Sequence, residues 1–275
     1  MKAALVLGGG GAKSLAHAGA WKALQERDVQ ITHIIGTSMG AVIGAVLASG
    51  SSVDELLITA RSLRSKDFAA ARLGTIVKGF FATSLFESRG LERTIARLVP
   101  ATRFAELKTP LTVTATDLDT GELVLFGTDS RRLQGALQPV LYASCALPLY
   151  FPPVVIAGRR LADGGLRAVL PLQMAAELRV DLVVAVSVGP GFDEATAQGV
   201  QSPVPPLVRA HGEAIRIMMA AQTERAIAEW PTTAPRLAVV RAVAEREATF
   251  AVGQADRFFD AGYQMTRQAM QKLDE

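Results

Sequence analysis

A glycine-flanked serine in the segment GTSMG, Gly36–Gly40, constrains this chain most. It follows an apolar run and precedes a run of small residues with helical spacing. This pattern predicts a strand, a sharp turn and a helix, with Ser38 at the helix N-terminus, where the helix dipole favours negative charge. We expect Gly36 to allow unusual backbone angles and Gly40 to let the helix pass close to the strand.

The serine in this turn has two interpretations. In the first it is a nucleophile elbow, with Thr37 and Met39 on either side of Ser38 and the hydroxyl lifted clear of its neighbours. A motif of this length often arises by chance, so the alternative is an ordinary tightly packed turn with a solvated serine. That alternative explains the glycines, but not the companion motifs described below.

A second glycine-rich turn lies at the start of the chain. Ala3–Leu7 is fully apolar, as is typical of a parallel strand covered on both faces, and Gly8–Gly11 follows it. Apolar residues then recur at helical spacing until about Asp28. A strand, a glycine loop and a helix together present backbone N–H groups that bind an anion.

Three kinds of anion site have such a loop, and the spacing separates them. A dinucleotide fingerprint needs a glycine where Lys13 or Ser14 stands, and a P-loop needs one where Ala12 stands. An oxyanion hole needs only N–H groups that face the nucleophile. Because two consecutive βα units place both loops at the same edge of the sheet, the pattern favours the oxyanion hole.

The remaining chain alternates between helical and strand-like segments, as in α/β proteins. Asp163 follows two short strands around Gly158 and precedes Gly164 and Gly165. Taken alone, Asp-Gly-Gly is a turn whose aspartate caps its own backbone. The other expected elements are helix over most of 51–106, a hairpin from 111–116 to 122–126, helix 133–144, strand 182–188, a loop over 189–206, helix 207–229, edge strand 237–240 and helix 254–272.

An aromatic patch lies in the glycine-bounded segment KGFFATSLF, residues 78–86. Phe80, Phe81 and Phe86 cluster there, in a chain with only 11 phenylalanines. One interpretation is core packing beneath a loop. The other is an acyl-chain entrance, since loops over a rigid sheet often carry function.

The composition restricts the class of protein. A chain of 275 residues with 49% hydrophobic and 20% charged residues is ordinary for a globular protein, and we expect one domain over 1–275. The net charge is +3 without a dense basic block, which argues against a nucleic-acid partner. The single cysteine, Cys145, excludes an internal disulfide and fits a reducing compartment. With no apolar run long enough to span a membrane, we expect a soluble, cytoplasmic protein whose contact with the inner membrane surface would be peripheral, through apolar loop residues.

Four separated motifs resemble those of the patatin-like acyl hydrolases, especially their single-domain bacterial members. The family's triple-glycine loop with a following basic residue is similar to GGGAK at 9–13, and its G-x-S-x-G elbow to GTSMG at 36–40. Its Ala-Ser-x-Ala-x-Pro helix end is similar to ASCALP at 143–148, and its Asp-Gly-Gly motif to 163–165. The order and approximate spacing agree from residue 3 to about residue 188, and we expect helices over 207–273 to complete the domain.

The resemblance implies a three-layer α/β/α sandwich around a mainly parallel central sheet. It implies that Ser38 is the nucleophile and Asp163 the base, without a histidine. The N–H groups of Gly9, Gly10 and Gly11 would form the oxyanion hole. Expected substrates are phospholipids, lysophospholipids or neutral acyl esters, cleaved without a metal ion or a cofactor.

This sequence departs from the family pattern at two places. Ser14 stands where the family usually has the last glycine of the loop, so the entry into the following helix is expected to differ. Ala168 and Val169 stand where the family often has asparagines, which removes polar groups near the active-site loop. These departures are the support for a second hypothesis, a degenerate non-catalytic module that binds a lipid or an anion.

A third hypothesis is an α/β-hydrolase with a Ser-Asp-His triad. Ser38, Asp163 and His211 follow the chain order of such triads. Two features oppose it. His211 falls in a helical apolar repeat rather than in a loop, and the elbow comes after too few strands. We expect His17 and His33, which precede the nucleophile, to be structural.

Overall fold

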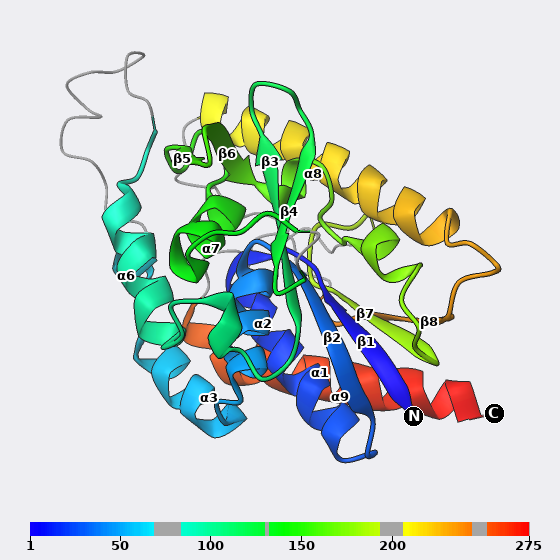
Figure 1. Ribbon diagram of the computed structural model, residues 1–275. Helices are drawn as coiled ribbons and strands as arrows, with labels where there is room; N and C mark the ends of the chain where they lie inside the picture. Colours follow the sequence, from blue (N-terminus) through cyan, green and yellow to red (C-terminus); the bar gives the residue numbers. More distant parts are fainter. Residues whose placement is uncertain (69–83, 130–131, 193–205, 244–251, 275) are drawn as a thin grey trace.

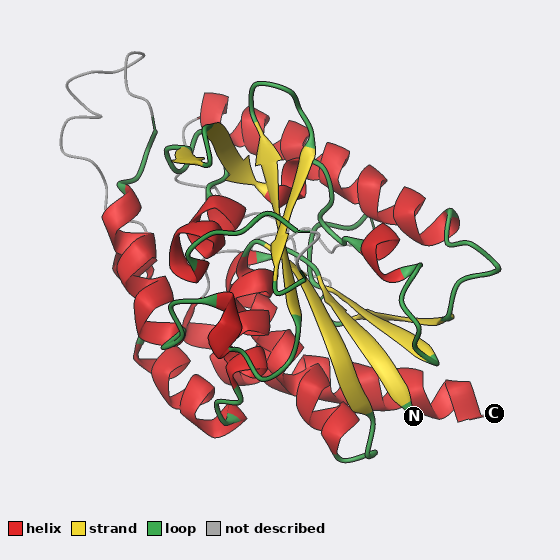
Figure 2. Ribbon diagram, in the orientation of Figure 1, coloured by secondary structure: helices red, strands yellow, loops and turns green. Residues whose placement is uncertain are grey.

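A mixed eight-stranded sheet forms the centre of the protein. The computed structural model describes residues 1–68, 84–129, 132–192, 206–243 and 252–274. Within these residues the strands lie in the order β5-β6-β3-β2-β1-β7-β8, and β4 also pairs with β3 (Figure 2). The strands are β1 (Lys2–Leu7), β2 (Gln30–Thr37), β3 (Leu111–Asp117), β4 (Leu123–Gly127), β5 (Val154–Ile156), β6 (Arg159–Asp163), β7 (Leu182–Ser187) and β8 (Arg236–Arg241).

The middle of the sheet is parallel and one end is antiparallel. The strands β3, β2, β1, β7 and β8 run parallel, whereas β4, β5 and β6 are antiparallel to their neighbours. Every residue of β7 is buried, as is every residue of β1 after Lys2. These two strands therefore have the covered faces that their apolar runs predict. The predicted hairpin over 111–126 is confirmed as β3 and β4.

Helices cover both faces of the sheet, which gives a three-layer α/β/α sandwich (Figure 1). Along β1 the side chains alternate: Leu5 and Leu7 enter the larger core, whereas Ala4 and Val6 enter the smaller one on the other face. The helix α8 contributes to the smaller core, and most of the others contribute to the larger one. The helices are α1 (Ala16–Gln25), α2 (Met39–Ser49), α3 (Val53–Ser62), α4 (Ser65–Phe68), α6 (Ser88–Leu98), α7 (Leu137–Cys145), α8 (Pro206–Ala228) and α9 (Ala255–Asp274).

The local sequence explains where α2 ends and α3 begins. Gly50 ends α2 in the left-handed region, with a φ of 81°, which a glycine adopts at little cost. Ser52 then opens α3 with a capping box: its hydroxyl accepts the N–H of Glu55, and the Glu55 carboxylate accepts the N–H of Ser52. None of the helices in the described part of the chain has both the length and the apolar character needed to cross a bilayer.

Two glycines allow α9 to lie directly against α1. A Cβ on Gly262 would lie 1.9 Å from the Ala16 carbonyl oxygen, and a Cβ on Gly19 would lie 2.0 Å from that of Phe259. The backbones of the two helices are thus in contact at this crossing. Phe258 and Met270 of α9 are almost fully buried. The C-terminal helix is therefore part of the main core.

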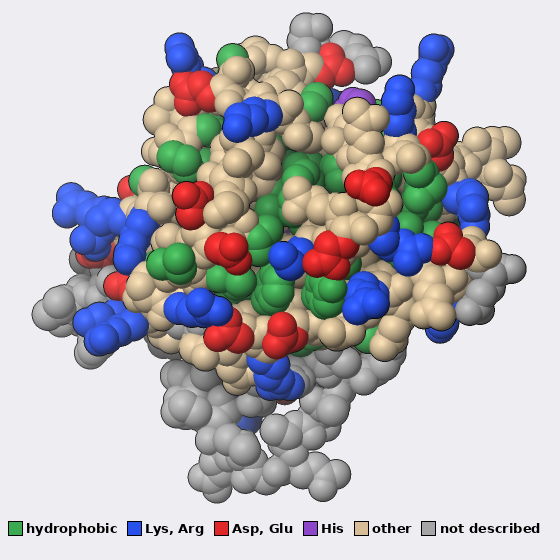
Figure 3. All heavy atoms as spheres, turned by 90° about the horizontal axis from the view of Figure 1, so that it is seen from below, with side chains coloured by type: hydrophobic (Ala, Val, Ile, Leu, Met, Phe, Trp, Pro, Cys, Tyr) green, Lys and Arg blue, Asp and Glu red, His purple; other side chains and the backbone are tan. Residues whose placement is uncertain are grey.

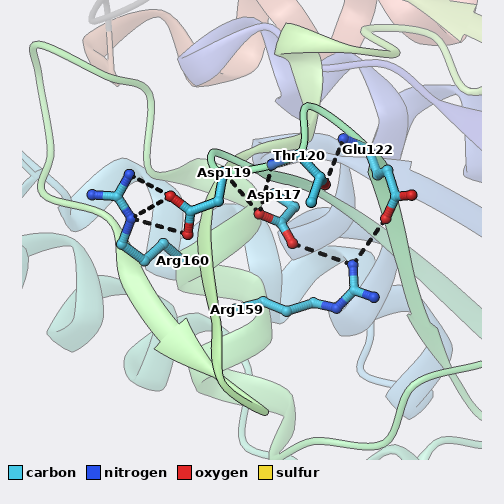
Figure 4. Close-up of polar contacts among 6 residues, drawn as sticks. All are labelled: Asp117, Asp119, Thr120, Glu122, Arg159 and Arg160. Atoms are coloured by element: carbon cyan, nitrogen blue, oxygen red, sulfur yellow. Dashed lines mark hydrogen bonds and ion pairs between the residues drawn. The ribbon is translucent and has the colours of Figure 1, made fainter.

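Ion pairs join the β3–β4 turn to the β5–β6 hairpin (Figure 4). The Arg159 guanidinium lies 3.2 Å from Asp117 and 3.1 Å from Glu122, and Arg160 lies 2.7 Å from Asp119. These contacts fix β6, the strand that ends in Asp163, against β3. Elsewhere, on the face seen from below, acidic and basic side chains are interspersed (Figure 3).

The described helices agree with the sequence expectations except at their ends. The predicted helix over 133–144 begins at Leu137, and the strand expected at 237–240 spans Arg236–Arg241. The edge position predicted for this strand is confirmed, since β8 is last in the sheet order. Parts of the expected helical region 51–106 and of the expected loop 189–206 lie outside the described residues.

Candidate active site

Two strands of opposite direction bring Ser38 and Asp163 together. Thr37, the last residue of β2, pairs with Thr114 of β3, and Asp163, the last residue of β6, pairs with Ala115. One edge of β3 is occupied by β4. The strands β2 and β6 must therefore share the opposite edge of β3, and they end at adjacent positions along it. The residues that follow β2 and end β6 therefore meet, although 125 positions separate them in sequence.

Ser38 sits on a strained turn between β2 and α2. Its φ is 55° and its ψ is −134°, values that a residue with a side chain rarely adopts. The prediction that Gly36 provides the unusual backbone angles is wrong, because the positive φ belongs to Ser38 and Gly36 stays outside that region. Gly36 is required for space instead: a Cβ there would lie 2.5 Å from the Ala41 Cα. Gly40 does allow a close approach, since its Cβ would lie 2.5 Å from the Leu7 carbonyl oxygen.

The Ser38 hydroxyl donates a hydrogen bond to Asp163, with 2.8 Å between Oγ and Oδ2. The other carboxylate oxygen, Oδ1, accepts the N–H of Gly165 at 2.7 Å. Asp163 thus caps its own turn, as the motif alone suggests, while its second oxygen faces the serine. A side chain on Gly164 would place a Cβ 2.2 Å from Thr114 Oγ1, so the glycine lets this turn lie against β3.

Burial makes Asp163 a stronger base than an ordinary aspartate. The residue is 5% exposed, and burial raises the pKa of its carboxyl from 3.8 to about 6. The hydrogen bonds from Gly165 and Ser38 act in the opposite direction, because they stabilise the carboxylate. The carboxyl is thus ionised at neutral pH but has a higher affinity for a proton than it would have in water.

The glycine loop lies against the serine, with one of its N–H groups already bonded. A Cβ on Gly9 would lie 3.1 Å from the Ser38 Cβ, so the two segments are in contact. The Gly9 N–H donates to the Val169 carbonyl at 3.0 Å and does not fit the predicted oxyanion role. Among the described residues, the N–H groups of Gly10 and Gly11 have no such acceptor. Gly11 has a φ of 60°, and Ala12 follows it into the 3₁₀ turn Gly11–Leu15.

Backbone groups at the second departure from the family pattern, Ala168 and Val169, contribute to the site. The carbonyl of Ala168 accepts a hydrogen bond from the buried Thr37 hydroxyl at 2.8 Å, and that of Val169 accepts the Gly9 N–H. Thr37 also bonds to Thr114 with 2.7 Å between the hydroxyl oxygens. The segment at 168–169 therefore supports both the elbow and the glycine loop without a polar side chain of its own.

Ser144 is a residue whose contribution sequence reasoning missed. It lies in the last turn of α7, is fully buried, and accepts the backbone N–H of Ser38 at 2.8 Å. This bond holds the strained residue in its unusual conformation. The signal was present in the ASCALP motif, but a contact between residues 106 positions apart does not follow from the sequence alone.

In the described part of the chain, no hydrogen bond joins a histidine to Ser38 or Asp163. His211 is exposed on α8, and His33 is partly buried, with Nδ1 3.1 Å from the Thr32 hydroxyl. His17 is fully buried, with Nε2 2.8 Å from the Gly8 carbonyl oxygen, and burial lowers its pKa to about 4. Because a carbonyl only accepts, the proton of this neutral ring lies on Nε2.

The aromatic patch is described only in part. Phe80 and Phe81 lie outside the described residues. Phe86 is partly buried, with its ring centroid 6.2 Å from that of Tyr150 and 5.6 Å from that of Phe151. It packs against the main core, as the core-packing interpretation of the aromatic patch expects.

The sandwich and this geometry define a class of α/β protein that pairs a serine at a strand-to-helix turn with a buried aspartate. The family model described as patatin-like phospholipase matches residues 5–176. The chain therefore belongs to the patatin-like phospholipase family, as its motifs predict.

Curated relatives and a solved structure agree with this assignment. An uncharacterized NTE family protein of Mycobacterium tuberculosis is 36% identical over 186 residues, which are 68% of this chain and 49% of the relative. Human patatin-like phospholipase domain-containing protein 6 is 31% identical over 188 residues, covering 68% of this chain and 13% of the relative. The chain thus spans about half or less of these proteins. The structure of VipD from Legionella pneumophila has a similar fold, with a TM-score of 0.52 at 17% identity over 98% of this chain and 66% of VipD.

Proposed function

We propose that this protein is a serine acyl hydrolase that cleaves carboxylic esters of lipids through Ser38 and Asp163. The observation that carries the proposal is the 2.8 Å hydrogen bond between the Ser38 hydroxyl and the Asp163 carboxylate. The positive φ of Ser38 supports it, because strained backbone of this kind is typical of functional sites. Membership of the patatin-like phospholipase family supports an ester of a lipid as the substrate.

In the first half of the reaction, Asp163 Oδ2 accepts the proton of the Ser38 hydroxyl while Oγ attacks the ester carbonyl carbon. The carbonyl π electrons move to its oxygen, which gives a tetrahedral oxyanion. When this intermediate collapses, the bond from carbon to the alcohol oxygen breaks. The leaving oxygen takes the proton from Asp163, and the acyl group remains on Ser38.

In the second half, a water molecule replaces the alcohol. Asp163 takes a proton from the water while the water oxygen attacks the acyl carbon. Collapse of the second oxyanion breaks the bond to Ser38 Oγ, which recovers its proton from Asp163. The products are a carboxylic acid and the free enzyme, so the aspartate is a base in one step and an acid in the next.

The negative charge on each oxyanion needs donors that are already in place. We assign this role to the N–H groups of Gly10 and Gly11, with the N-terminal end of α2 adding the positive end of its dipole. Gly9 is left out because its N–H is bonded to Val169. Removing one such donor typically costs about 10² to 10³ in kcat.

The direct test is covalent labelling. Purified wild type should react with a fluorophosphonate probe at Ser38 and should hydrolyse p-nitrophenyl acetate and butyrate. Ser38→Ala should lose both reactions and keep its fold, because the change removes one oxygen from a turn. Ser62→Ala is the control: it removes an exposed hydroxyl that donates to the Thr59 carbonyl and accepts from Arg97, neither of them part of the proposed site, and it should keep both reactions. Ester hydrolysis by purified, folded Ser38→Ala at close to the wild-type rate would refute the proposal, and absence of labelling in wild type would favour a non-catalytic binding module.

Contact with a lipid surface is part of the same proposal. Leu207 and Met218 of α8 are 70% and 53% exposed, and Phe192 is 57% exposed. The same helix reaches the site, since Gln222 donates to the carbonyl of Leu166, three residues after Asp163. Replacing Leu207 and Met218 by serine should weaken sedimentation with phospholipid vesicles. Equal sedimentation of this variant and wild type would exclude this surface.

A further inference from the structure

One buried side chain ties the start of the glycine loop to the helix that follows it. His17 is the second residue of α1, and its Nε2–H donates at 2.8 Å to the carbonyl of Gly8, the first glycine of the loop. The ring is fully buried, and its other nitrogen, Nδ1, has no hydrogen-bond partner among the described residues. Because a buried polar nitrogen without a partner is costly, an apolar side chain would serve packing better. The bond to Gly8 is therefore what the imidazole contributes at this position.

This bond helps to hold a single peptide group at both of its ends. The carbonyl of Gly8 and the N–H of Gly9 belong to the same planar peptide unit, which can turn only as a whole. The carbonyl end is held by His17, and the N–H end by the Val169 carbonyl at 3.0 Å. Both glycines are buried, whereas the next two residues of the loop are partly exposed. The orientation of this peptide therefore sets the direction in which the chain enters the exposed half of the loop.

The same carbonyl also lies against the turn that carries the nucleophile. A Cβ on Gly40 would lie 2.5 Å from the Gly8 carbonyl oxygen, so the backbone just after Ser38 is in contact with this peptide. Glycine has more accessible backbone conformations than other residues, so the run Gly8–Gly11 keeps one shape only where other groups hold it. The position of the loop N–H groups relative to Ser38 thus depends on how firmly this peptide is held.

We propose that His17 is a positioning residue for ester hydrolysis: it holds the Gly8–Gly9 peptide so that the N–H groups of Gly10 and Gly11 face the oxyanion. This inference rests on the proposed function. Among the described residues, the ring bonds to the loop and not to the reacting side chains, so His17 acts through the loop. Oxyanion donors act mainly on the transition state, so misplacing them should lower kcat and leave KM nearly unchanged.

The test compares two replacements of equal length. In His17→Gln the amide nitrogen occupies the ε position of the side chain, as Nε2 does in histidine, so this variant can still donate to Gly8. In His17→Met a methyl group takes that place, and nothing donates. With p-nitrophenyl butyrate, kcat should fall by about 10- to 100-fold in His17→Met, with KM within about twofold of wild type. His17→Gln should keep kcat within about threefold of wild type, because it restores the donor.

A further variant controls for the loss of a histidine as such. His33→Met replaces a partly buried histidine of β2 whose Nδ1 lies near the Thr32 hydroxyl and not near the glycine loop. It should keep the wild-type kcat and KM. All variants are checked for folding by their thermal transitions.

Hydrogen exchange, followed by NMR, tests the holding of the peptide without any substrate. In wild type the Gly9 N–H should exchange more slowly than those of Gly10 and Gly11, because it is buried and bonded, whereas these two have no such acceptor among the described residues. Exchange at Gly9 should be about tenfold faster in His17→Met, the effect of one lost hydrogen bond, and should stay slow in His17→Gln.

Three results would overturn the inference and leave the proposed function standing. The first is an equal loss of kcat in His17→Gln and His17→Met, since the shape of the ring and not its N–H would then matter. The second is a wild-type kcat in His17→Met. The third is equally fast exchange of the three loop N–H groups in wild type, which decides the matter even where neither variant folds. Wild type that neither labels at Ser38 nor hydrolyses the butyrate ester would instead refute the proposed function, and the inference with it.

Discussion

At the scale of single residues, the protonation of Asp163 makes the proposed mechanism dependent on pH. Burial raises the pKa of this carboxyl to about 6, and only its ionised form accepts the serine proton. We therefore expect kcat/KM for p-nitrophenyl butyrate to rise as the pH passes through about 6 and to level off above it. A rate that stays constant from pH 5 to pH 8, with the protein folded throughout, would show that another group is the base.

The raised pKa of Asp163 also predicts that replacing this residue stabilises the protein. A carboxyl whose pKa is higher in the folded state contributes stability while it is protonated, and this contribution is lost as the pH rises through about 6. Above that pH the buried carboxylate is unfavourable, by at most about 3 kcal/mol. Asp163→Asn should therefore be inactive but have a higher Tm than wild type near pH 8, and the gain should shrink near pH 5. A lower Tm for this variant near pH 8 would contradict the argument.

Ser144 should affect both stability and rate, because it holds Ser38 in its strained conformation. Ser144→Ala leaves the N–H of the partly buried Ser38 without its acceptor, and an unsatisfied buried donor typically costs about 1 to 3 kcal/mol. We expect a lower Tm. We also expect kcat to fall by about tenfold, which corresponds to the loss of about 1.4 kcal/mol of transition-state stabilisation when Ser38 is held less firmly for attack. Ser49→Ala, at the end of α2, is the control. A Tm loss with an unchanged kcat would mean that Ser144 supports packing alone.

At the scale of helices and strands, the crossing of α1 and α9 depends on glycine. A Cβ at Gly262 would lie 1.9 Å from the Ala16 carbonyl oxygen, so Gly262→Ala must push the helices apart. Overpacking of this kind lowers the free energy of unfolding by about 1 to 3 kcal/mol. Each kcal/mol corresponds to a fall in Tm of roughly 2 to 4 °C. Gly253→Ala, whose Cβ would have no atom within 4 Å, is the matched control. Equal Tm values for the two variants would show that the helices separate freely.

The elements that the sequence predicts well are those with a strong local pattern. The apolar runs of β1 and β7 and the Asp-Thr-Gly turn between β3 and β4 identify their elements directly, because periodicity and turn chemistry are local. The start of α7 was predicted four residues too early, at Leu133 instead of Leu137. The local sequence did carry a signal for the later start, because Gly135 is a poor helix former and Pro139 is tolerated in a first helical turn.

Contacts between segments that are distant in the sequence cannot be predicted from local patterns. The strands β2 and β6 end at neighbouring positions of β3 because β4 occupies the opposite edge of β3. No single residue determines this strand arrangement. The same is true of the bond from Gly9 to Val169, which removes one predicted oxyanion donor. Motif resemblance identified Ser38 and Asp163 as partners, whereas the groups that support them required the tertiary structure.

At the scale of the whole molecule, the family model matches only part of the chain that forms the sheet and the main core. The matched region ends at residue 176, before β7, β8, α8 and α9. Yet β7 pairs with β1 in the middle of the sheet, and α9 lies against α1, which follows the glycine loop after the 3₁₀ turn Gly11–Leu15. The segments after residue 176 therefore support the proposed site through the core beneath it.

This dependence predicts that the protein does not fold without its last helix. A chain that ends at residue 243 lacks α9 and would expose the side of α1 on which α9 now lies. It would also remove the buried side chains of Phe258 and Met270 from the main core. We expect it to aggregate or to lose its cooperative thermal transition, and to lose labelling at Ser38 because the glycine loop loses its support. A chain that ends at Leu273 is the control, since the ion pair that it loses among the described residues is the exposed pair between Arg27 and Asp274, and such pairs contribute about 1 kcal/mol or less. A shortened chain that unfolds cooperatively at the wild-type Tm and still labels at Ser38 would show that α9 is dispensable and that the sheet with its remaining helices is sufficient for the site.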